Sequence, residues 1–259
     1  MDLGIHGKHA IVCASSKGLG LACATALARE GCNVVINGRN EETLAAAQNA
    51  LQEASTGDII SVAADINTTE GRARLLSACE APDILVNNNA GPPPAEFKNT
   101  SSEDWQGALD ANLLAPAFMI QGVIEGMKER RFGRIVNITS AMVKSPHPMM
   151  GLSTAARSGL TALCKGISND AVAYNVTINN ILPERFDTDR QKFMAMMMVQ
   201  NQGITMEEAR QAIADTINAK RFGQPEEFGD ACAYLCSAQA GYISGQNLQM
   251  DGGSYAGLI

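Results

Sequence analysis

The sequence predicts an α/β protein built as one doubly wound parallel sheet, Rossmann-like, with about seven strands and helices on both faces. Short runs of apolar residues alternate with amphipathic stretches along the chain. The apolar runs are continuous, which is typical of strands buried on both faces, and right-handed crossovers between such strands wind the sheet in both directions. The 259 residues contain no repeat, linker or low-complexity stretch, so we expect a single nucleotide-binding domain over residues 1–259.

The strands are expected where apolar residues cluster between turn signals, at residues 10–14, 34–36, 59–64, 84–86, 134–139, 176–182 and 248–251. Helical periodicity predicts helices at residues 19–30, 40–54, 68–79, 101–130, 151–174 and 225–237. Gly31 is a natural stop for the first helix, and Asn40 a natural cap for the second. Residues 184–222 are rich in helix formers and interrupt the alternation, so we expect a lid-like helical insertion there.

Composition excludes several classes of function. The net charge of −7 disfavours a nucleic-acid partner, because phosphate binding needs clustered lysine and arginine. The seven cysteines are scattered, which predicts reduced thiols and neither a disulfide framework nor a metal site. We see no signal peptide and no apolar run of about 20 residues, and therefore expect a cytoplasmic protein without a membrane segment.

A glycine turn between the first strand and the first helix predicts a phosphate site. The spacing is Ala14-x3-Gly18-x-Gly20, and glycines there let the backbone approach a pyrophosphate at a helix N-terminus. Close packing of helix on strand is the alternative explanation for two glycines. The residues expected to bind the cofactor in this turn are Ser15, Ser16, Lys17, Gly18, Leu19 and Gly20.

A basic residue at the end of the second strand indicates which dinucleotide binds. A carboxylate at this position selects the free ribose hydroxyl of NAD, whereas the chain has Arg39, which suits a 2′-phosphate. Lys17 adds a second positive charge nearby. We therefore expect NADP(H), with NAD(H) still possible.

Segments spread over nearly the whole chain give a more specific signal. They are ASSKGLG (14–20), AADI (63–66), DILVNN (83–88), LDANLLAP (109–116), GRIVNITS (133–140), NNILP (179–183), RFGQPEEFG (221–229) and ISGQNLQMDGG (243–253). Together they resemble the short-chain dehydrogenase/reductase family, in particular its members similar to 3-oxoacyl-carrier-protein reductase. The resemblance implies a nicotinamide-dependent oxidoreductase of a small-molecule or acyl-type substrate.

The resemblance also implies roles for single residues and an assembly. It places Asp65 and Ile66 beside the adenine, Thr188 on the nicotinamide amide, and Asn88 and Pro183 along the cofactor. It makes Asn112 the helix asparagine that holds a proton-relay water, and Ser140 the catalytic serine. The helices at 101–130 and 151–174 are expected to pair across a twofold axis, giving a homotetramer or homodimer.

The sequence departs from the family pattern where the chemistry should lie. Counting from Ser140, and from the flanking TAARSGLTAL (154–163), Ser153-x-x-x-Arg157 stands where the family has Tyr-x-x-x-Lys. Three other departures affect the expected cofactor site. Ala14 replaces the first glycine of the turn, Asn89-Ala90 replaces Ala-Gly unless that turn has slipped to Gly91, and Glu184 replaces the glycine after Pro183.

The substitution removes the usual proton donor. A serine hydroxyl is a far weaker acid than a phenol and its side chain is shorter, so Ser153 cannot be the direct general acid. Arg157 can still donate to ribose hydroxyls and supply positive charge. His147, in the loop after the fifth strand, is the first candidate to replace the tyrosine, and Lys144 and Glu184 are others. For each of them the alternative is an ordinary solvent-exposed side chain without a catalytic role. Ser140 and Ser153 together are an alternative site for an oxyanion or a water.

Three functions remain open at this stage. The leading one is an NADP(H)-dependent oxidoreductase that interconverts a carbonyl and an alcohol with a non-standard proton donor. The second is a non-redox enzyme on the same fold, namely a lyase, dehydratase or dehalogenase-like catalyst, and the third is a non-catalytic nucleotide sensor or partner subunit. The methionine-rich segment at residues 194–198 lies where the family keeps its substrate lid, although helix packing explains it equally well.

Overall fold

The computed structural model describes residues 2–258, and in it seven parallel strands form one sheet in the order β3-β2-β1-β4-β5-β6-β7. The predicted fold class is confirmed. The strands are β1 (His9–Val12), β2 (Asn33–Gly38), β3 (Ile59–Ala63), β4 (Ile84–Asn87), β5 (Gly133–Ile138), β6 (Val176–Pro183) and β7 (Asn247–Met250). The order reverses between β1 and β4, and in such sheets the crevice at this switch point is where ligands bind.

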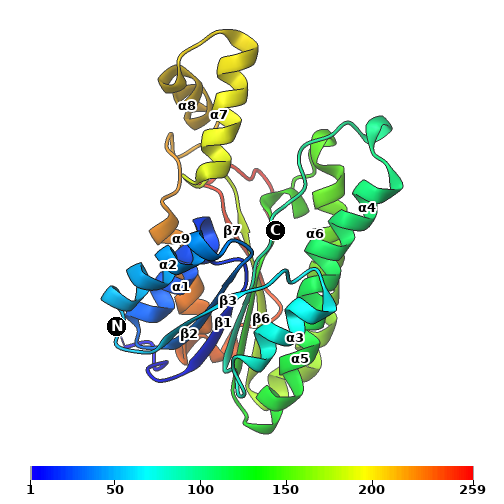
Figure 1. Cartoon of the computed structure of the whole chain (residues 1–259). Helices are drawn as coiled ribbons and strands as arrows, with labels where there is room; N and C mark the ends of the chain where they lie inside the picture. The colour runs from blue at the N-terminus through cyan, green and yellow to red at the C-terminus, as the bar shows by residue number, and fades with distance from the viewer. Residues whose placement is uncertain (1, 259) are drawn as a thin grey trace.

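Helices cover both faces of the sheet (Figure 1). One layer contains α1 (Gly18–Arg29), α2 (Glu41–Ala54) and α9 (Pro225–Cys236); the other contains α3 (Thr69–Ser77), α5 (Ala115–Glu129) and α6 (Gly151–Ala171). Alternate residues of each strand point to opposite faces of the sheet and pack into two separate cores. Val86 and Val136 pack toward the first layer, and Leu85 and Ile135 pack toward the second.

The helix expected at residues 101–130 forms with an irregular turn inside it. Helix α4 (Ser102–Leu109) runs into a π-helical segment, Asp110–Leu114, and then into α5. Such π-bulges often occur at functional sites, and this one contains Asn112. By length and composition alone, the stretch Ser102–Glu129 could cross a membrane. Several of its apolar side chains, among them Met119, Ile120 and Val123, are instead buried in the core beside the sheet, as in a core helix.

Two helices of the expected insertion extend beyond the carboxyl ends of the strands (Figure 1). Helices α7 (Asp189–Gln202) and α8 (Met206–Asp215) share a small core of their own, built around Ala195, Ile213 and Phe222. Several large apolar side chains of α7 remain exposed, including Phe193 and Met196. Helices α7 and α8 therefore lie above the carboxyl edge of the sheet, where the strand order predicts a ligand site.

A chain of asparagines crosses four neighbouring strands just below that edge. Asn87, Asn137, Asn180 and Asn247 are register partners on β4, β5, β6 and β7. Each amide donates to the next side-chain oxygen, at 2.9, 3.0 and 2.8 Å. Buried polar chains of this kind fix a register when every member is bonded, so the loops that leave these strands start from fixed positions.

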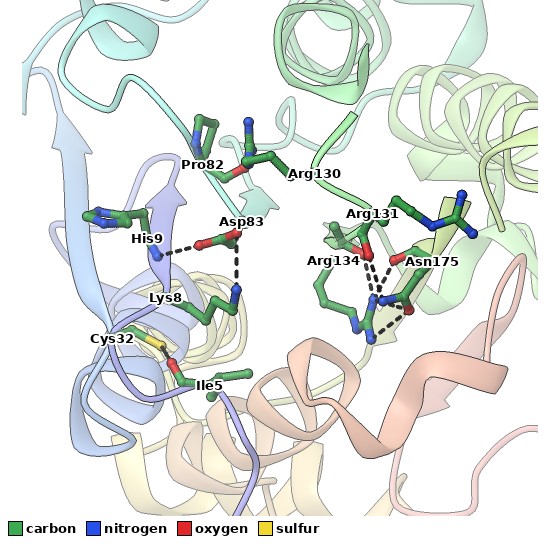
Figure 2. A network of polar contacts seen from close by, with 11 residues as sticks. Ile5, Lys8, His9, Cys32, Pro82, Asp83, Arg130, Arg131, Arg134 and Asn175 are labelled. Atoms are coloured by element: carbon green, nitrogen blue, oxygen red, sulfur yellow. Dashed lines mark hydrogen bonds and ion pairs between the residues drawn. The ribbon is translucent and has the colours of Figure 1, made fainter. Parts of the chain in front are cut away.

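At the opposite, amino-terminal edge of the sheet, charged side chains form hydrogen bonds and ion pairs within the chain (Figure 2). Asp83 accepts hydrogen bonds from the His9 amide and the Lys8 ammonium. The buried guanidinium of Arg134 donates to the Ser237 carbonyl and to the carbonyl and side chain of Asn175. These contacts therefore stabilise the fold at this edge of the sheet.

Candidate functional site

A cleft of about 900 Å³ opens at the carboxyl ends of the central strands. Its volume lies in the range of ordinary ligand sites. Of the residues predicted to bind a cofactor, those lining it are Ser16, Lys17, Gly18, Leu19, Arg39, Asp65, Ile66, Asn88, Arg157, Pro183 and Thr188. Of the predicted catalytic residues, it collects Ser140, His147, Ser153 and Arg157. Segments far apart in the sequence are thus brought to one cavity.

The glycine turn is held by side chains behind it. The first strand ends at Val12, before the predicted Ala14, because Ala14 adopts a left-handed conformation with φ of 44°. Its amide donates to Asn37 Oδ1 at 3.2 Å, and its carbonyl accepts from Asn88 Nδ2 at 3.0 Å. Ser15 points away from the cleft, donating its hydroxyl to the Val12 carbonyl, so it shapes the turn from behind.

The N-terminus of α1 is open to an anion. Lys17 occupies the cap position without a side-chain hydrogen bond to the helix, and no acidic residue lies in the first turn. The free N–H groups and the positive end of the helix dipole therefore face the cleft. A side chain at Gly20 would clash with the Ala14 carbonyl, so this glycine is required where helix and strand meet.

The strain at Ala14 gives a first testable prediction. An L-residue in the left-handed region costs about 1–2 kcal/mol, so Ala14→Gly should leave the free energy of unfolding unchanged or raise it by up to about 1 kcal/mol. The same change at Ala24, which is fully buried in α1, should lower it by about 1 kcal/mol or more. Urea denaturation of both variants checks this, and equal losses would contradict the assigned conformation.

Ser153 and Arg157 lie on one face of α6, one turn apart, at the floor of the cleft. Arg157 Nε donates to Ser153 Oγ at 3.2 Å, and one terminal nitrogen donates to the Ile138 and Thr139 carbonyls at 2.7 and 2.8 Å. The other terminal nitrogen has a single long bond, 3.4 Å to the Asn89 carbonyl. Burial, and after it the positive charge of Arg190, lowers the pKa of Arg157 from 12.5 to about 10, so the group remains a cation at neutral pH.

Near Arg157, the side-chain oxygen of Asn112 receives no hydrogen bond from the described residues. Its Nδ2 donates to the Ala90 and Ala108 carbonyls at 3.3 and 3.4 Å, while its buried Oδ1 has no partner among residues 2–258. A cavity of about 10 Å³, lined by both Asn112 and Arg157, lies next to the main cleft. This is about the space of one water molecule, which would satisfy the amide oxygen.

The three side chains predicted as alternative proton donors lie in different surroundings. His147 lines the cleft, and its Nδ1 accepts from the Met149 amide at 3.2 Å, so the neutral ring carries its proton on Nε2. Lys144 lies outside the cleft, with its ammonium 5.5 Å from the centre of the Tyr255 ring. Glu184 does line the cleft, but it forms no ion pair with Arg157; its ion-pair partner is Arg185, at 3.8 Å.

The asparagine turn after β4 does not close the cleft. The Asn89 amide donates to Asn67 Oδ1 at 2.8 Å and to the Ala111 carbonyl at 3.1 Å, which anchors it to neighbouring loops. Gly91 lies beside Arg157: a side chain there would come within 3.4 Å of the guanidinium. The departures from the family pattern therefore leave the cavity open.

Some residues of the site were missed from the sequence. Asn37 organises the glycine turn, and its only signal was an amide at the end of an apolar strand. Arg190 lines the cleft without belonging to any motif. The apolar wall of the cleft is made mainly of methionines, namely Met142, Met149, Met150 and Met194, together with Phe193. Of these, only the residues on α7 were considered from the sequence.

The thiols and carboxylates do not form a metal centre. Within the described chain no group of three or more histidine, cysteine or acidic side chains is arranged to hold a metal ion. All seven cysteines are free and buried, and burial raises the pKa of Cys13, Cys32 and Cys164 to about 12. These thiols are therefore poor nucleophiles at neutral pH.

Comparison with known proteins gives a consistent result. Residues 13–255 match a family model described as enoyl-(acyl carrier protein) reductase. The chain is 31% identical to the NADPH-dependent reductase BacG of Bacillus subtilis, over 95% of this chain and 97% of the relative. It is 30% identical to the 3-oxoacyl-[acyl-carrier-protein] reductase FabG of Rickettsia bellii, over 96% and 97%. The solved L-sorbose reductase from Gluconobacter frateurii, complexed with NADPH and L-sorbose, superposes with a TM-score of 0.94 at 29% identity, covering 100% of both chains.

Proposed function

The chain belongs to the short-chain dehydrogenase/reductase family, and from this premise we propose that it is an NADP(H)-dependent oxidoreductase that interconverts a carbonyl and an alcohol. The observation that carries the proposal is the open cleft, with a phosphate turn at one end and Ser140, Ser153 and Arg157 at the other. Relatives named as NADPH-dependent, and a solved relative with NADPH bound, support the choice of cofactor.

The residues present fit a dinucleotide. The uncapped start of α1 and the space kept by Gly20 suit a pyrophosphate, Lys17 and Arg39 suit a 2′-phosphate, and Asp65 suits the adenine side. Pro183 and Thr188, with Ile66 and Asn88, would line the remainder of the cofactor. When bound, NADPH supplies the hydride that reduces a carbonyl carbon.

The protein must then manage charge and a proton on the carbonyl oxygen. Arg157 is a fixed cation at the cleft floor, and Ser140 and Ser153 are hydroxyl donors beside it, so together they would stabilise an oxyanion. The proton would come from solvent, through a water held by Asn112, or from His147. The imidazolium form of His147 would lose its bond to the Met149 amide, which makes the water route the stronger of the two.

Binding and turnover measurements test the proposal. NADPH and NADH are titrated onto the protein by fluorescence, and then oxidation of NADPH is followed on a carbonyl panel for the parent and His147→Ala. We expect tight NADPH binding, slow turnover, and less than a threefold loss in His147→Ala. Absence of NADPH binding would refute the function, while tight binding without any turnover would favour a nucleotide sensor, consistent with the missing phenol.

Cofactor choice gives a separate prediction. Arg39→Asp should weaken NADPH binding about tenfold or more, because it replaces the cation that suits the 2′-phosphate by an anion, and should improve NADH binding. Arg29→Gln, an exposed basic residue of α1 outside the cleft, is the matched control. If the ratio of NADPH to NADH affinity is the same in both variants, Arg39 does not select the cofactor.

Two further expectations belong to the same proposal. Helices α7 and α8 would act as a lid over the substrate, since Phe193 and Met194 line the cleft. Three apolar side chains on the layer of α5 and α6 are exposed, namely Leu114, Phe118 and Leu163. They suit an interface between copies of the chain, so we expect a homotetramer or homodimer, located in the cytoplasm. Sedimentation of the parent and of Phe118→Glu measures the assembly.

A further inference from the structure

Two arginines that line the cleft have no acidic partner among the described residues. Within residues 2–258 neither Arg157 nor Arg190 lies within 4.0 Å of a carboxylate. The acids of the same segment are already used: Glu184 pairs with Arg185, Asp187 with Arg210, and Asp189 with Lys192. Arg190 is exposed on the first turn of α7 and lines the cavity. Arg157 lines the same cavity, so two like charges share one cleft.

A second buried arginine of the chain shows why this is unusual. Arg134 also has no carboxylate, but its donors end on the carbonyl and side chain of Asn175 (Figure 2). They also reach the carbonyl of Ser237, the C-cap of α9, where the helix dipole is negative. Arg134 lines neither the main cleft nor the small cavity beside it. Arg157 instead has another cation near it and a terminal nitrogen with only a 3.4 Å bond. Burying a charge is costly unless it is paired, and here the partner is missing from the chain itself.

The phosphates of a dinucleotide have binding groups of their own elsewhere in the cleft. The phosphate turn already offers the open N-terminus of α1, Lys17 and Arg39. Arg157 lies instead with Ser153 at the end of β5, beside Gly91. An anion on the second ligand would therefore neutralise these two cations.

We propose that the substrate carries a carboxylate, held by Arg190 and by the field of Arg157, with an apolar chain against the methionine wall of the cleft. The wall comprises Met142, Met149, Met150, Phe193 and Met194, and methionine surfaces adapt to flexible apolar chains. Combined with the proposed function, on which this inference rests, the substrate class is an oxo acid with an aliphatic tail. Reduction adds a hydride to the carbonyl carbon and a proton to its oxygen, and the carboxylate is unchanged.

Hexanoate and its neutral counterpart hexanamide test the inference without turnover. Both are titrated by calorimetry onto protein saturated with NADPH, so that the cofactor has already filled its own anion sites. We expect hexanoate to bind at least about tenfold more tightly than hexanamide, since one charge-assisted contact is worth about this factor. Arg190→Gln should remove this preference while NADPH affinity stays within about twofold of the parent.

Controls separate the cations from one another. Arg29→Gln should retain the preference for hexanoate, and Arg157→Lys, which keeps the charge, should retain more of it than Arg157→Gln. Equal affinities for hexanoate and hexanamide in the parent overturn the inference. So does an Arg190→Gln variant that loses NADPH affinity and keeps its preference for hexanoate, because the cation then serves the cofactor. A parent that binds no NADPH refutes the proposed function instead, and hexanoate is then titrated onto the ligand-free protein.

Discussion

Ser153→Tyr should accelerate carbonyl reduction by about 10²-fold or more, the usual contribution of a general acid. The side chain at 153 projects from α6 into the cleft, beside the Arg157 guanidinium and Gly91, which leaves room on that side. A phenol there would lie next to a fixed cation, and the cation would lower the phenol pKa from its ordinary value of about 10. NADPH oxidation on the carbonyl panel measures kcat for both proteins.

The matched control for this change is Ser153→Phe, which adds the ring without the hydroxyl. Both variants lose the bond from Arg157 Nε to Ser153 Oγ, so any structural effect is shared between them. We expect only the tyrosine variant to reduce carbonyls faster than the parent. In the reverse direction, oxidation of the alcohol, we expect the rate of the tyrosine variant to rise with pH and the rate of the parent not to do so. If the two variants are equally slow, position 153 does not reach the reacting oxygen and the assigned register is wrong.

The fold was predictable because its signals are local. Continuous apolar runs such as 84–86 and 134–139 define buried strands, and Gly31 and Asn40 end and begin helices where expected. The boundaries that failed have specific causes. The first strand stops before Ala14 because that residue turns left-handed, and the helix expected at 101–130 contains a π-helical turn around Asn112. Neither feature changes the hydrophobic pattern, so periodicity could not detect them.

The site was predictable as far as motifs reach and no further. Lys17, Arg39, Ser140 and Arg157 were found because they follow strands or occupy motif positions, and the sheet brings strand ends together. Arg190 was missed because its place in the cleft depends on how α7 leaves β6. The failure of Glu184 to pair with Arg157 likewise depends on loop geometry, since the neighbouring Arg185 captures the carboxylate.

Gly20→Ala should produce the largest loss of cofactor binding, a weakening of NADPH affinity by about 10²-fold or more. The added carbon would overlap the Ala14 carbonyl and approach Asn88 Nδ2 to 2.7 Å, so the bond that closes the turn must break and the start of α1 must move. Overpacking of this kind also costs about 1–3 kcal/mol of stability. Gly166→Ala, on α6 with no atom within 4 Å of the new carbon, should instead stabilise the protein by up to about 1 kcal/mol.

Thermal unfolding with and without NADPH separates these two effects of Gly20→Ala. A ligand that binds only the folded state raises Tm by an amount set by its concentration relative to Kd, so saturating NADPH should raise the Tm of the parent and of Gly166→Ala equally. The Gly20→Ala variant should start from a lower Tm and gain little from NADPH at the same concentration. A full Tm gain in this variant would mean that the turn between β1 and α1 tolerates the shift, and the phosphates would then have to bind elsewhere in the cleft.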